Sequence, residues 1–458
     1  MNLQGFQTHT LDEHPQGKWV QSILQAALRA VDPATAVARH LVRKGSLLVA
    51  NGRTYDLSLY KRIWLVGAGK AGVPMAHSAS QILGEFVTGG AVIVKKSVEE
   101  ATRTELVSDR VILYGGGHPV PDQRGVAATQ HVIQLLKSAG EKDFVICLIS
   151  GGGSALLTAP VMGVSLEALK TVTRQLLACG ASIDEINTLR KHLDSVKGGG
   201  LARLAAPADV LTLILSDVVG DPPDVIASGP TAPDPSTFSN GLEVLDRYAL
   251  LGKVPAAIAT HLNKGARGDL PETPKPGDPV FERVNNLVVG SNLQAAEAAI
   301  SAAISYGYNP MLLTTYLQGE ARQAGRMLAA IARQVACTQQ PVRRPACIVT
   351  GGETTVTLKG DGLGGRNQEL ALGAVRDLAG LKNVLLITLA TDGDDGPTGA
   401  AGAVVSGETL ARAEMLGLIP EVFLAHNDSF HFFEPLGDLL LPGQTQTNVN
   451  DLAFLFVF

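Results

Sequence analysis

The chain has 458 residues, of which 45% are hydrophobic and 18% are charged, and its formal net charge at pH 7 is -5. A chain of this length is expected to build two or three domains. The slight acidic excess argues against nucleic acid as a partner, because nucleic-acid binding requires a basic face. It does not argue against a small anionic substrate, which a few local cations can hold.

The beginning of the chain and its cysteines predict a cytoplasmic protein. Residues 1–20 are polar and lack the apolar core of a signal peptide. No run of about 18 apolar residues occurs, so we expect no membrane span. The four cysteines form no CxxC pair, and Cys147 and Cys347 lie within apolar runs. We therefore expect all four thiols to be reduced.

Short apolar runs alternate with helical stretches along most of the chain. Near-continuous apolarity is typical of strands buried on both faces of a parallel sheet, and strand–helix alternation is typical of βαβ units. The pattern therefore predicts an α/β protein with two doubly wound, mostly parallel, Rossmann-like domains. The predicted strands are 62–66, 91–94, 144–149, 210–215, 286–289, 311–314, 346–349 and 384–389.

Two segments depart from this pattern. Residues 253–283 are rich in proline, glycine and charge, so we interpret them as a connector between the domains. The predicted domains are accordingly 1–265 and 283–458. Residues 354–358 (TTVTL) alternate and precede a glycine turn, which predicts one arm of a hairpin.

The first glycine-rich loop, GAGKAG at 67–72, follows a predicted strand. It matches the GxGxxG pattern, in which Gly67 and Gly69 would cradle phosphate at a helix N-terminus; a tight strand–helix turn is the alternative. The next strand ends in two lysines rather than the acidic residue of an NAD site, although an NADP phosphate would tolerate lysines. Lys70 places a cation where an anion would bind.

Two further segments are candidates for anion binding. In SGGGS at 150–154, backbone N–H groups and one hydroxyl would form an anion nest, with a flexible turn as the alternative. Along 187–200, the apolar residues recur at helical spacing and Arg190 lies off that apolar face. This patch would bind a carboxylate or phosphate, or would simply be solvated. The nest residues are Gly151, Gly152, Gly153 and Ser154.

Carboxylates also follow predicted strands. Asp217 comes after 210–215, in a segment that also holds Asp221, and Asp392 begins the acidic stretch of TDGDDG. A carboxylate at a strand end is a common catalytic base or Mg²⁺ ligand. Three carboxylates within four residues suit a hard cation, with an exposed acidic turn as the alternative.

Several other polar residues lie in loops. Arg366 is predicted in the first turn of a helix, where a cation opposes the helix dipole, and this makes it a functional candidate together with Glu353. Asn448 could contact a ligand or belong to a polar loop. We interpret His118 and His426 as turn or packing histidines.

These features together favour phosphoryl transfer. That reaction requires anion cradles, fixed cations, a divalent metal and a positioned hydroxyl, with little covalent chemistry. The histidine-rich ligation of a metal hydrolase and the GxSxG pattern of a serine hydrolase are both missing from the sequence.

Nine motifs occur in order along the chain: VGAGKAG, GGGHPVPD, LISGGGSALL, NTLRKHLDSVKGGGLA, SDVVGDPPDVIASGPT, GGETTVT, GGRNQE, ATDGDDG and TNVNDL. Together they resemble the glycerate 2-kinase family, whose C-terminal part is the MOFRL domain, here about 344–458. The resemblance runs from about residue 19 to residue 457. It implies ATP-dependent phosphorylation of D-glycerate at its 2-hydroxyl, with Mg²⁺, in an active-site cleft between two α/β domains.

Other functions stay open beside this one. Family members have often been named hydroxypyruvate reductases, so an NAD(P)H-dependent reductase is the first alternative. A non-catalytic protein that binds a sugar acid is the second. D-glycerate and the nucleotide are the expected partners, without nucleic acid or membrane, and a homodimer is left open.

The resemblance also singles out Lys70, Arg366, Asp217, Asp392 and Asn448, for which we state a hypothesis. Lys70 and Arg366 would neutralise charge on the transferring phosphoryl group, while Asp392 and Asp217 would hold Mg²⁺ or accept the proton of the 2-hydroxyl. The predicted residues for binding substrate or nucleotide are Gly67, Gly69, Gly151, Gly152, Gly153, Ser154, Arg190, Glu353 and Asn448.

Overall fold

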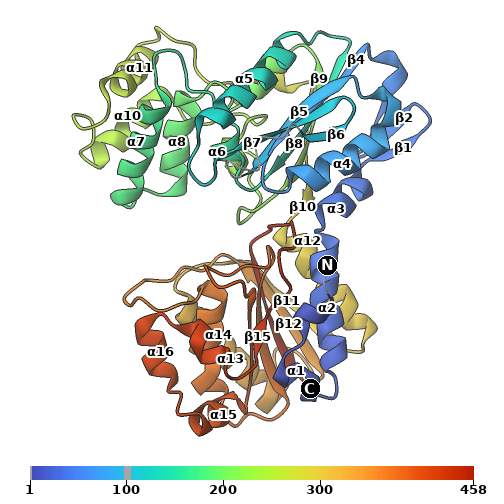
Figure 1. Cartoon of the computed structure of the whole chain (residues 1–458), viewed down its shortest axis with the longest axis vertical. Coiled ribbons are helices and arrows are strands. Elements are labelled where there is room, and N and C mark those ends of the chain that lie inside the picture. The colour runs from blue at the N-terminus through green and yellow to red at the C-terminus, as the bar shows by residue number, and fades with distance from the viewer. Residues whose placement is uncertain (1–2, 97–104) are drawn as a thin grey trace. The chain divides into compact units, whose positions relative to one another are not determined.

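The structure is a computed structural model that describes residues 3–96 and 105–458 (Figure 1). Its residues form two compact units. The central unit comprises Pro33–Ser216 and Asp221–Val289, and the terminal unit comprises Met1–Asp32, Asp217–Gly220 and Gly290–Phe458. This division differs from the predicted domains, which placed residues 1–32 with the N-terminal half of the chain.

The central unit is built on a seven-stranded sheet in the order β10-β9-β8-β4-β5-β7-β6. The pairs from β9 to β7 are parallel, and β6 is antiparallel to β7. The predicted strands of this half are thus confirmed. The strands are β4 (Arg62–Ala68), β5 (Gly89–Lys95), β6 (Glu105–Ser108), β7 (Val111–Gly116), β8 (Asp143–Ser150), β9 (Asp209–Leu215) and β10 (Val284–Gly290).

The register of this sheet brings several loops together. Ala68 at the end of β4 pairs with Ile93 of β5 on one side and with Ile149 of β8 on the other. Lys95, which ends β5, pairs with Gly116, which ends β7. The C-terminal ends of β4, β5, β7 and β8 therefore lie at the same edge of the sheet, where α/β proteins bind their ligands.

Helices and a small antiparallel sheet complete the central unit. The sequence did not predict that sheet, whose strands β1 (Val42–Lys44), β2 (Leu47–Ala50) and β3 (Arg53–Asp56) are short and largely polar or exposed. Four of the helices, α7, α8, α10 and α11, share a hydrophobic core of their own (Figure 1). The helices are α3 (Pro33–His40), α4 (Gly72–Leu83), α5 (Gln123–Lys137), α6 (Gly153–Leu156), α7 (Leu166–Ala178), α8 (Ile183–Leu193), α9 (Gly200–Ala205), α10 (Phe238–Arg247) and α11 (Ala256–Ala266).

The terminal unit contains a six-stranded sheet in the order β11-β12-β16-β13-β14-β15. β11 and β12 are parallel, whereas β16 is antiparallel to both of its neighbours, and β13, β14 and β15 pair antiparallel in turn. Hence β11, β12, β13 and β15 share one direction. The α/β class is confirmed. The strands are β11 (Asn309–Leu317), β12 (Ala346–Gly352), β13 (Val384–Ala390), β14 (Gly402–Ser406), β15 (Leu439–Leu440) and β16 (Asp451–Val457).

The predicted hairpin arm at 354–358 is wrong. Apart from an isolated bridge between Glu320 and Thr355, these residues form no strand. Thr357 instead bonds to the Glu320 carboxylate through both its backbone N–H and its hydroxyl, at 3.3 and 2.9 Å. Hydrogen bonds to the Glu320 side chain thus take the place of the backbone hydrogen bonds of a hairpin, which the alternating pattern indicated.

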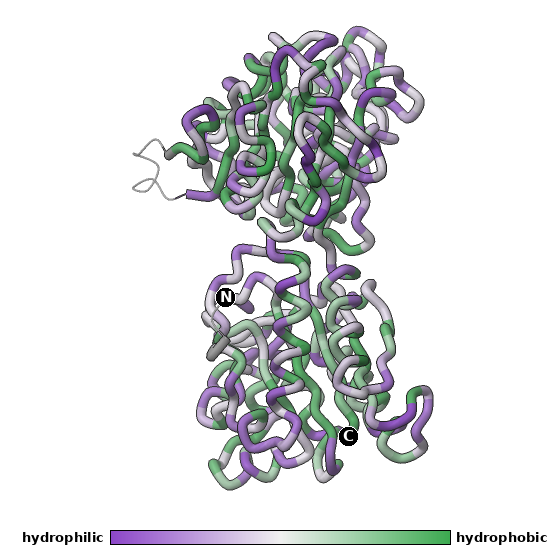
Figure 2. Tube along the Cα trace, turned by 90° about the vertical axis from the view of Figure 1, so that its right-hand side faces the viewer, coloured by the Kyte–Doolittle hydropathy of each residue, from purple (hydrophilic) through white to green (hydrophobic). Residues whose placement is uncertain are grey.

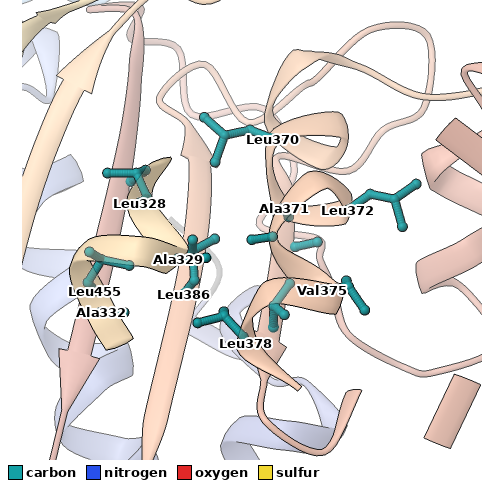
Figure 3. Packing of buried hydrophobic residues seen from close by; sticks show 14 of the residues in the cluster. Leu328, Ala329, Ala332, Leu370, Ala371, Leu372, Val375, Leu378, Leu386 and Leu455 are labelled. Atoms are coloured by element: carbon teal, nitrogen blue, oxygen red, sulfur yellow. The ribbon is translucent and has the colours of Figure 1, made fainter. Parts of the chain in front are cut away.

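The core of the terminal unit includes two helices in close contact, together with residues of β12, β13, β14 and β16 (Figure 3). A Cβ atom on Gly325 of α13 (Ala321–Thr338) would lie 2.0 Å from the Leu370 carbonyl oxygen of α14 (Arg366–Leu378). A Cβ on Gly373 would likewise lie 2.5 Å from the carbonyl oxygen of Arg322. Glycine is required at both contacts, and this packing fixes the start of α14, where Arg366 lies.

The N-terminal helices belong to the terminal unit because α2 packs against α12. α2 carries an apolar face that includes Val20, Ile23 and Leu24, all fully buried. Within each unit the hydrophobic residues follow the strands (Figure 2). No helix in the described ranges is long and apolar enough to cross a membrane. The remaining helices are α1 (His9–Glu13), α2 (Gly17–Ala30), α12 (Asn292–Ser305), α15 (Thr409–Met415), α16 (Pro420–His426) and α17 (Ser429–Phe433).

Candidate active site

The loop after β4 packs closely against the end of β8. Lys70 N–H donates to the Gly151 carbonyl at 2.8 Å. A Cβ atom would lie 2.3 Å from the Leu148 carbonyl oxygen if placed on Gly67, and 2.0 Å from Ser150 Oγ if placed on Gly69. Close packing alone therefore explains glycine at both positions, and it brings Lys70 beside the SGGGS loop.

Lys70 lies near a second lysine and near His118, predicted from the sequence as a turn or packing histidine. A Cβ on Gly152, which has φ +82°, would meet the His118 ring at 2.9 Å and Lys70 Cγ at 3.4 Å. Burial, and then the charges of Lys70 and Lys95, lower the pKa of His118 to about 4. The imidazole is therefore neutral near pH 7. We call Lys70, Lys95, His118 and residues 151–154 the glycine-loop site.

Among the residues that the structure describes, the lysines of this site have no acidic counterpart. Within residues 3–96 and 105–458, neither Lys70 nor Lys95 forms an ion pair with a carboxylate. Both side chains are exposed at the ligand-binding edge of the sheet. Their positive charge is thus available to an incoming anion.

Ser154 is held from both sides by buried polar groups. Its hydroxyl lies 3.0 Å from the hydroxyl of Ser228, which donates to Asn187 Oδ1 at 2.9 Å. Lys197 Nζ donates to the Ser154 carbonyl at 2.9 Å and lies 3.6 Å from the buried carboxylate of Asp194. These contacts fix the SGGGS loop, so Lys197 is a positioning residue.

Arg190 is a partly buried cation on α8. Burial lowers the pKa of its guanidinium, and its charge contributes to lowering the pKa of Lys197. Among the residues that the structure describes, no carboxylate pairs with Arg190. The predicted cationic patch is therefore this one unpaired arginine, whereas the adjacent Lys191 is bound to Asp224 and Asp234.

The terminal unit presents a different arrangement around Arg366. This residue begins α14, and its Nη1 lies 2.6 Å from Glu353 Oε1 while its Nε lies 2.6 Å from Asp451 Oδ2. Burial opposes its charge, but Asp451 and Glu353 together raise the pKa of Arg366. We call Arg366, Glu353, Asp451 and Asp395 the Arg366 site.

Asp451, the first residue of β16, was not predicted. Burial, together with the nearby Asp395 and against the effect of Arg366, raises the pKa of its carboxyl to about 7. Asn292 Nδ2 donates to the Asp451 carbonyl at 2.9 Å and so fixes the start of the strand. Nothing in the TNVND pattern distinguishes Asp451 from its polar neighbours, because its importance arises from the pairing with Arg366.

The acidic TDGDDG loop does not form the predicted three-carboxylate site. Asp395 accepts from the backbone N–H groups of Asn367 and Gln368 at 3.1 and 2.9 Å, so it binds the N-terminus of α14. Asp394 Oδ1 accepts from a backbone N–H at 3.1 Å, and Asp392 Oδ1 from that of Asp394 at 3.2 Å. The described part of the chain contains no cluster of three metal-ligating side chains.

Asp395 also explains how a cation is tolerated at a helix N-terminus. A cation at this end opposes the helix dipole, but a buried carboxylate hydrogen-bonded to the first N–H groups offsets it. The unfavourable position of the Arg366 charge at the start of a helix is therefore offset by Asp395 within the Arg366 site.

The two other predicted residues of this unit lie in loops. Asn448 Oδ1 accepts from Asn450 N–H at 3.1 Å, and Thr391 Oγ1 donates to the Asn450 carbonyl at 2.6 Å. The TNVND loop thus runs beside the loop that carries Asp392. Asp217 follows β9 and groups with the terminal unit.

Comparisons with known proteins support the motif resemblance. The family described as "Domain of unknown function (DUF4147)" matches residues 19–263, and the MOFRL family matches residues 346–451. A D-glycerate 2-kinase from Thermotoga maritima is 43% identical over 420 residues, which is 91% of this chain and 96% of that protein. The chain belongs to the glycerate 2-kinase family.

The fold agrees with this membership. A crystal structure of a glycerate kinase from Thermotoga maritima matches with a TM-score of 0.85 at 39% identity, covering 96% of this chain and 99% of that one. Names within the glycerate 2-kinase family nevertheless vary. A protein of Agrobacterium vitis, 37% identical over 96% of this chain and 94% of its own length, carries the provisional name hydroxypyruvate reductase.

Proposed function

We propose that this protein is a glycerate 2-kinase that transfers the terminal phosphoryl group of ATP to the 2-hydroxyl of D-glycerate. The observation that carries the proposal is the uncompensated positive charge of the glycine-loop site. Lys70 and Lys95 lie at the edge where four parallel strands end, without a carboxylate partner in the described chain. A polyphosphate is the type of ligand that such a site attracts.

In this proposal Lys70 neutralises charge that develops on the transferring phosphoryl group. Residues 151–153 bind phosphate or the substrate carboxylate through backbone N–H groups, and Ser154 contributes a hydroxyl held in place by Ser228 and Lys197. His118, neutral near pH 7, adds no further positive charge and can donate or accept a hydrogen bond.

For Arg366, in the terminal unit, we propose a role in stabilising phosphoryl charge. Glu353 and Asp451 hold its guanidinium in one orientation through contacts at Nη1 and Nε. Preorganised donors of this kind lower the barrier because they need no rearrangement during the reaction. Glu353 and Asp451 are therefore positioning residues for Arg366, and Asn448 contacts the substrate or nucleotide from the neighbouring loop.

The carboxylates of the terminal unit would bind Mg²⁺ only together with phosphate oxygens of the nucleotide. Mg²⁺ in kinases is bound through one or two carboxylates plus substrate phosphates. In line with the motif resemblance, we propose Asp392 and Asp217 as its ligands, and either could instead accept the 2-hydroxyl proton. Asp395 binds the start of α14. When bound, Mg²⁺ would neutralise phosphate charge; chelation with EDTA should abolish turnover.

The decisive experiment compares kinase with reductase activity. Purified protein is incubated with D-glycerate, ATP and Mg²⁺, and separately with hydroxypyruvate and NADH or NADPH. We expect 2-phosphoglycerate in the first mixture, detected by phosphorus NMR, and no nicotinamide oxidation in the second. Oxidation of nicotinamide without phosphoglycerate would refute the proposal, and glycerate binding without any turnover would favour a sugar-acid binding protein.

We also propose a cytoplasmic location, which the cysteines support. Cys147, Cys179, Cys337 and Cys347 are all free thiols, and burial raises the pKa of Cys147 to about 12, so that thiol is unreactive. Cell fractionation tests the location. A homodimer remains a prediction, which light scattering of the purified protein tests.

A further inference from the structure

A pocket of about 540 Å³ lies in the central unit. Its apolar lining includes Val120 from the loop before α5 and Leu169 and Leu177 from α7. Its polar lining includes Ser154, Arg190 and Lys197. A mostly apolar pocket of this size with a few polar groups is typical of a small-molecule site.

The charges around this pocket favour an anion. Arg190 is partly buried without a carboxylate partner in the described chain, and Lys170 and Arg174 also line the pocket. The one carboxylate of the lining, Glu167, is bound to Lys170 at 2.8 Å. The pocket therefore combines an apolar wall with net positive charge, which suits a ligand that is apolar at one end and anionic at the other.

D-glycerate does not have this character. It is a three-carbon acid without apolar surface, and it would fill only a small part of the pocket. A nucleotide has a flat base for the apolar wall and phosphates for the arginine. We propose that this pocket holds the adenosine end of the nucleotide, with Arg190 bound to its phosphates.

The chain connects the pocket directly with the glycine-loop site. Pro119 and Ser154 line the pocket, and the residues next to them in the chain lie beside Lys70, namely His118 and the Gly152–Gly153 stretch. Phosphates that extend past Ser154 would therefore reach Lys70. This inference rests on the proposed function, because it places the donor of that reaction.

Two variants test the two halves of the pocket. Arg190→Gln removes the charge, and Leu177→Trp narrows the apolar side at a residue that is 61% exposed, so that folding should tolerate it. Leu59→Trp, at a 74% exposed leucine of the central unit outside the pocket, is the matched control. ADP and adenosine binding are measured by calorimetry, and KM is measured for ATP and for D-glycerate.

We expect Arg190→Gln to weaken ADP binding and raise KM for ATP by roughly 10- to 100-fold, with a smaller effect on adenosine, because a charged hydrogen bond is lost. Leu177→Trp should weaken adenosine and ADP alike by about tenfold. KM for D-glycerate should change little in either variant, and Leu59→Trp should behave as wild type. Arg190→Lys should recover part of the ADP affinity.

Unchanged ADP affinity in both folded variants would overturn the inference while leaving the kinase activity intact. A raised KM for D-glycerate with unchanged ADP binding would assign the pocket to the acid instead. Melting temperatures identify a misfolded variant. If Arg190→Gln is misfolded, the ADP affinities of Arg190→Lys and Leu177→Trp decide whether the pocket holds the nucleotide. Failure of the proposed function itself would appear differently, as wild-type protein that forms no phosphoglycerate.

Discussion

The two candidate sites differ in whether their positively charged side chain is paired with carboxylates. In the glycine-loop site Lys70 is exposed and has no carboxylate partner within the described residues. In the Arg366 site the arginine is bound by Glu353 and Asp451, and Asp395 caps the helix that carries it. The same class of side chain is thus free to receive an anion in one unit and already neutralised in the other.

A cation can contribute to a site by attracting an anion or by holding a fixed orientation, and a sequence motif does not tell these two contributions apart. An unpaired cation attracts a ligand but lacks a fixed orientation, whereas a cation between two carboxylates is oriented but attracts anions weakly. We therefore expect Lys70 to contribute through charge and Arg366 through geometry.

Arg366→Ala should have the largest effect, because it removes an oriented donor and leaves two carboxylates without their partner. Turnover should fall by roughly 100-fold or more. The free energy of unfolding should fall by about 2 kcal/mol, less than for a fully buried pair because the Arg366 side chain is 33% exposed. Steady-state kinetics and chemical denaturation measure the two effects.

Arg376→Ala on the same helix is its control, since Arg376 pairs with Glu421 at the surface and that side chain is 56% exposed. It should cost less than about 1 kcal/mol and leave turnover unchanged. Arg366→Lys should not restore turnover, because an ammonium cannot replace the planar guanidinium. If Arg366→Ala lowers only stability and the folded protein turns over normally, Arg366 has no part in the reaction.

Lys70→Ala should lower turnover by roughly 100-fold but leave stability within about 0.5 kcal/mol, because the side chain is exposed and unpaired. Lys142→Ala, at an exposed lysine just before β8, should change neither quantity. Combining Lys70→Ala with Arg366→Ala then tests whether both act on one group, since their effects would not add. Near-normal turnover in Lys70→Ala would exclude it from the mechanism.

Asp451→Asn should change how the free energy of unfolding depends on pH, because it removes a buried carboxyl group with a raised pKa. Because the folded protein holds the proton of Asp451 up to about pH 7, whereas an unfolded aspartate releases it near pH 4, wild-type stability falls as pH rises between these values. The slope is at most about 1.4 kcal/mol per pH unit. Asp451→Asn should lack this fall in stability with pH. Asp394→Asn, at an exposed aspartate, is the control and should retain it. Equal slopes in wild type and Asp451→Asn would contradict the raised pKa.

His118 offers the most local test of the glycine-loop site. Burial, then Lys70 and Lys95, hold its pKa at about 4, so Lys70→Ala should raise it toward the ordinary value of 6.5. NMR titration of the imidazole measures the change, with Lys142→Ala as reference. An unchanged pKa would mean that Lys70 does not approach His118 in solution.

The sequence predicted eight of the described strands, and the loops after several of them, because continuous apolar runs and glycine clusters are local signals. It missed β16 as a strand between β12 and β13, since its position depends on pairing with residues about 60 to 110 positions earlier in the chain. The hairpin at 354–358 failed because Glu320, distant in sequence, binds Thr357.

The candidate site shows the same limit. Lys70 and Arg366 were identifiable because each sits in a distinctive motif, but the carboxylates of TDGDDG look equivalent in sequence. Only the fold assigns Asp395 to the start of α14, and only the fold places His118 against Gly152 and Asp451 against Arg366. Such roles depend on tertiary contacts that no local pattern encodes.

The position of β16 also bears on the order in which the protein is made. Every other strand of its sheet leaves the ribosome before it, so β12 and β13 lack a neighbour on the facing sides until the last strand has been translated. Open strand edges are sites of aggregation during biosynthesis. The central unit can assemble while the nascent chain is still growing, whereas the terminal unit must wait for the final residues of the sheet.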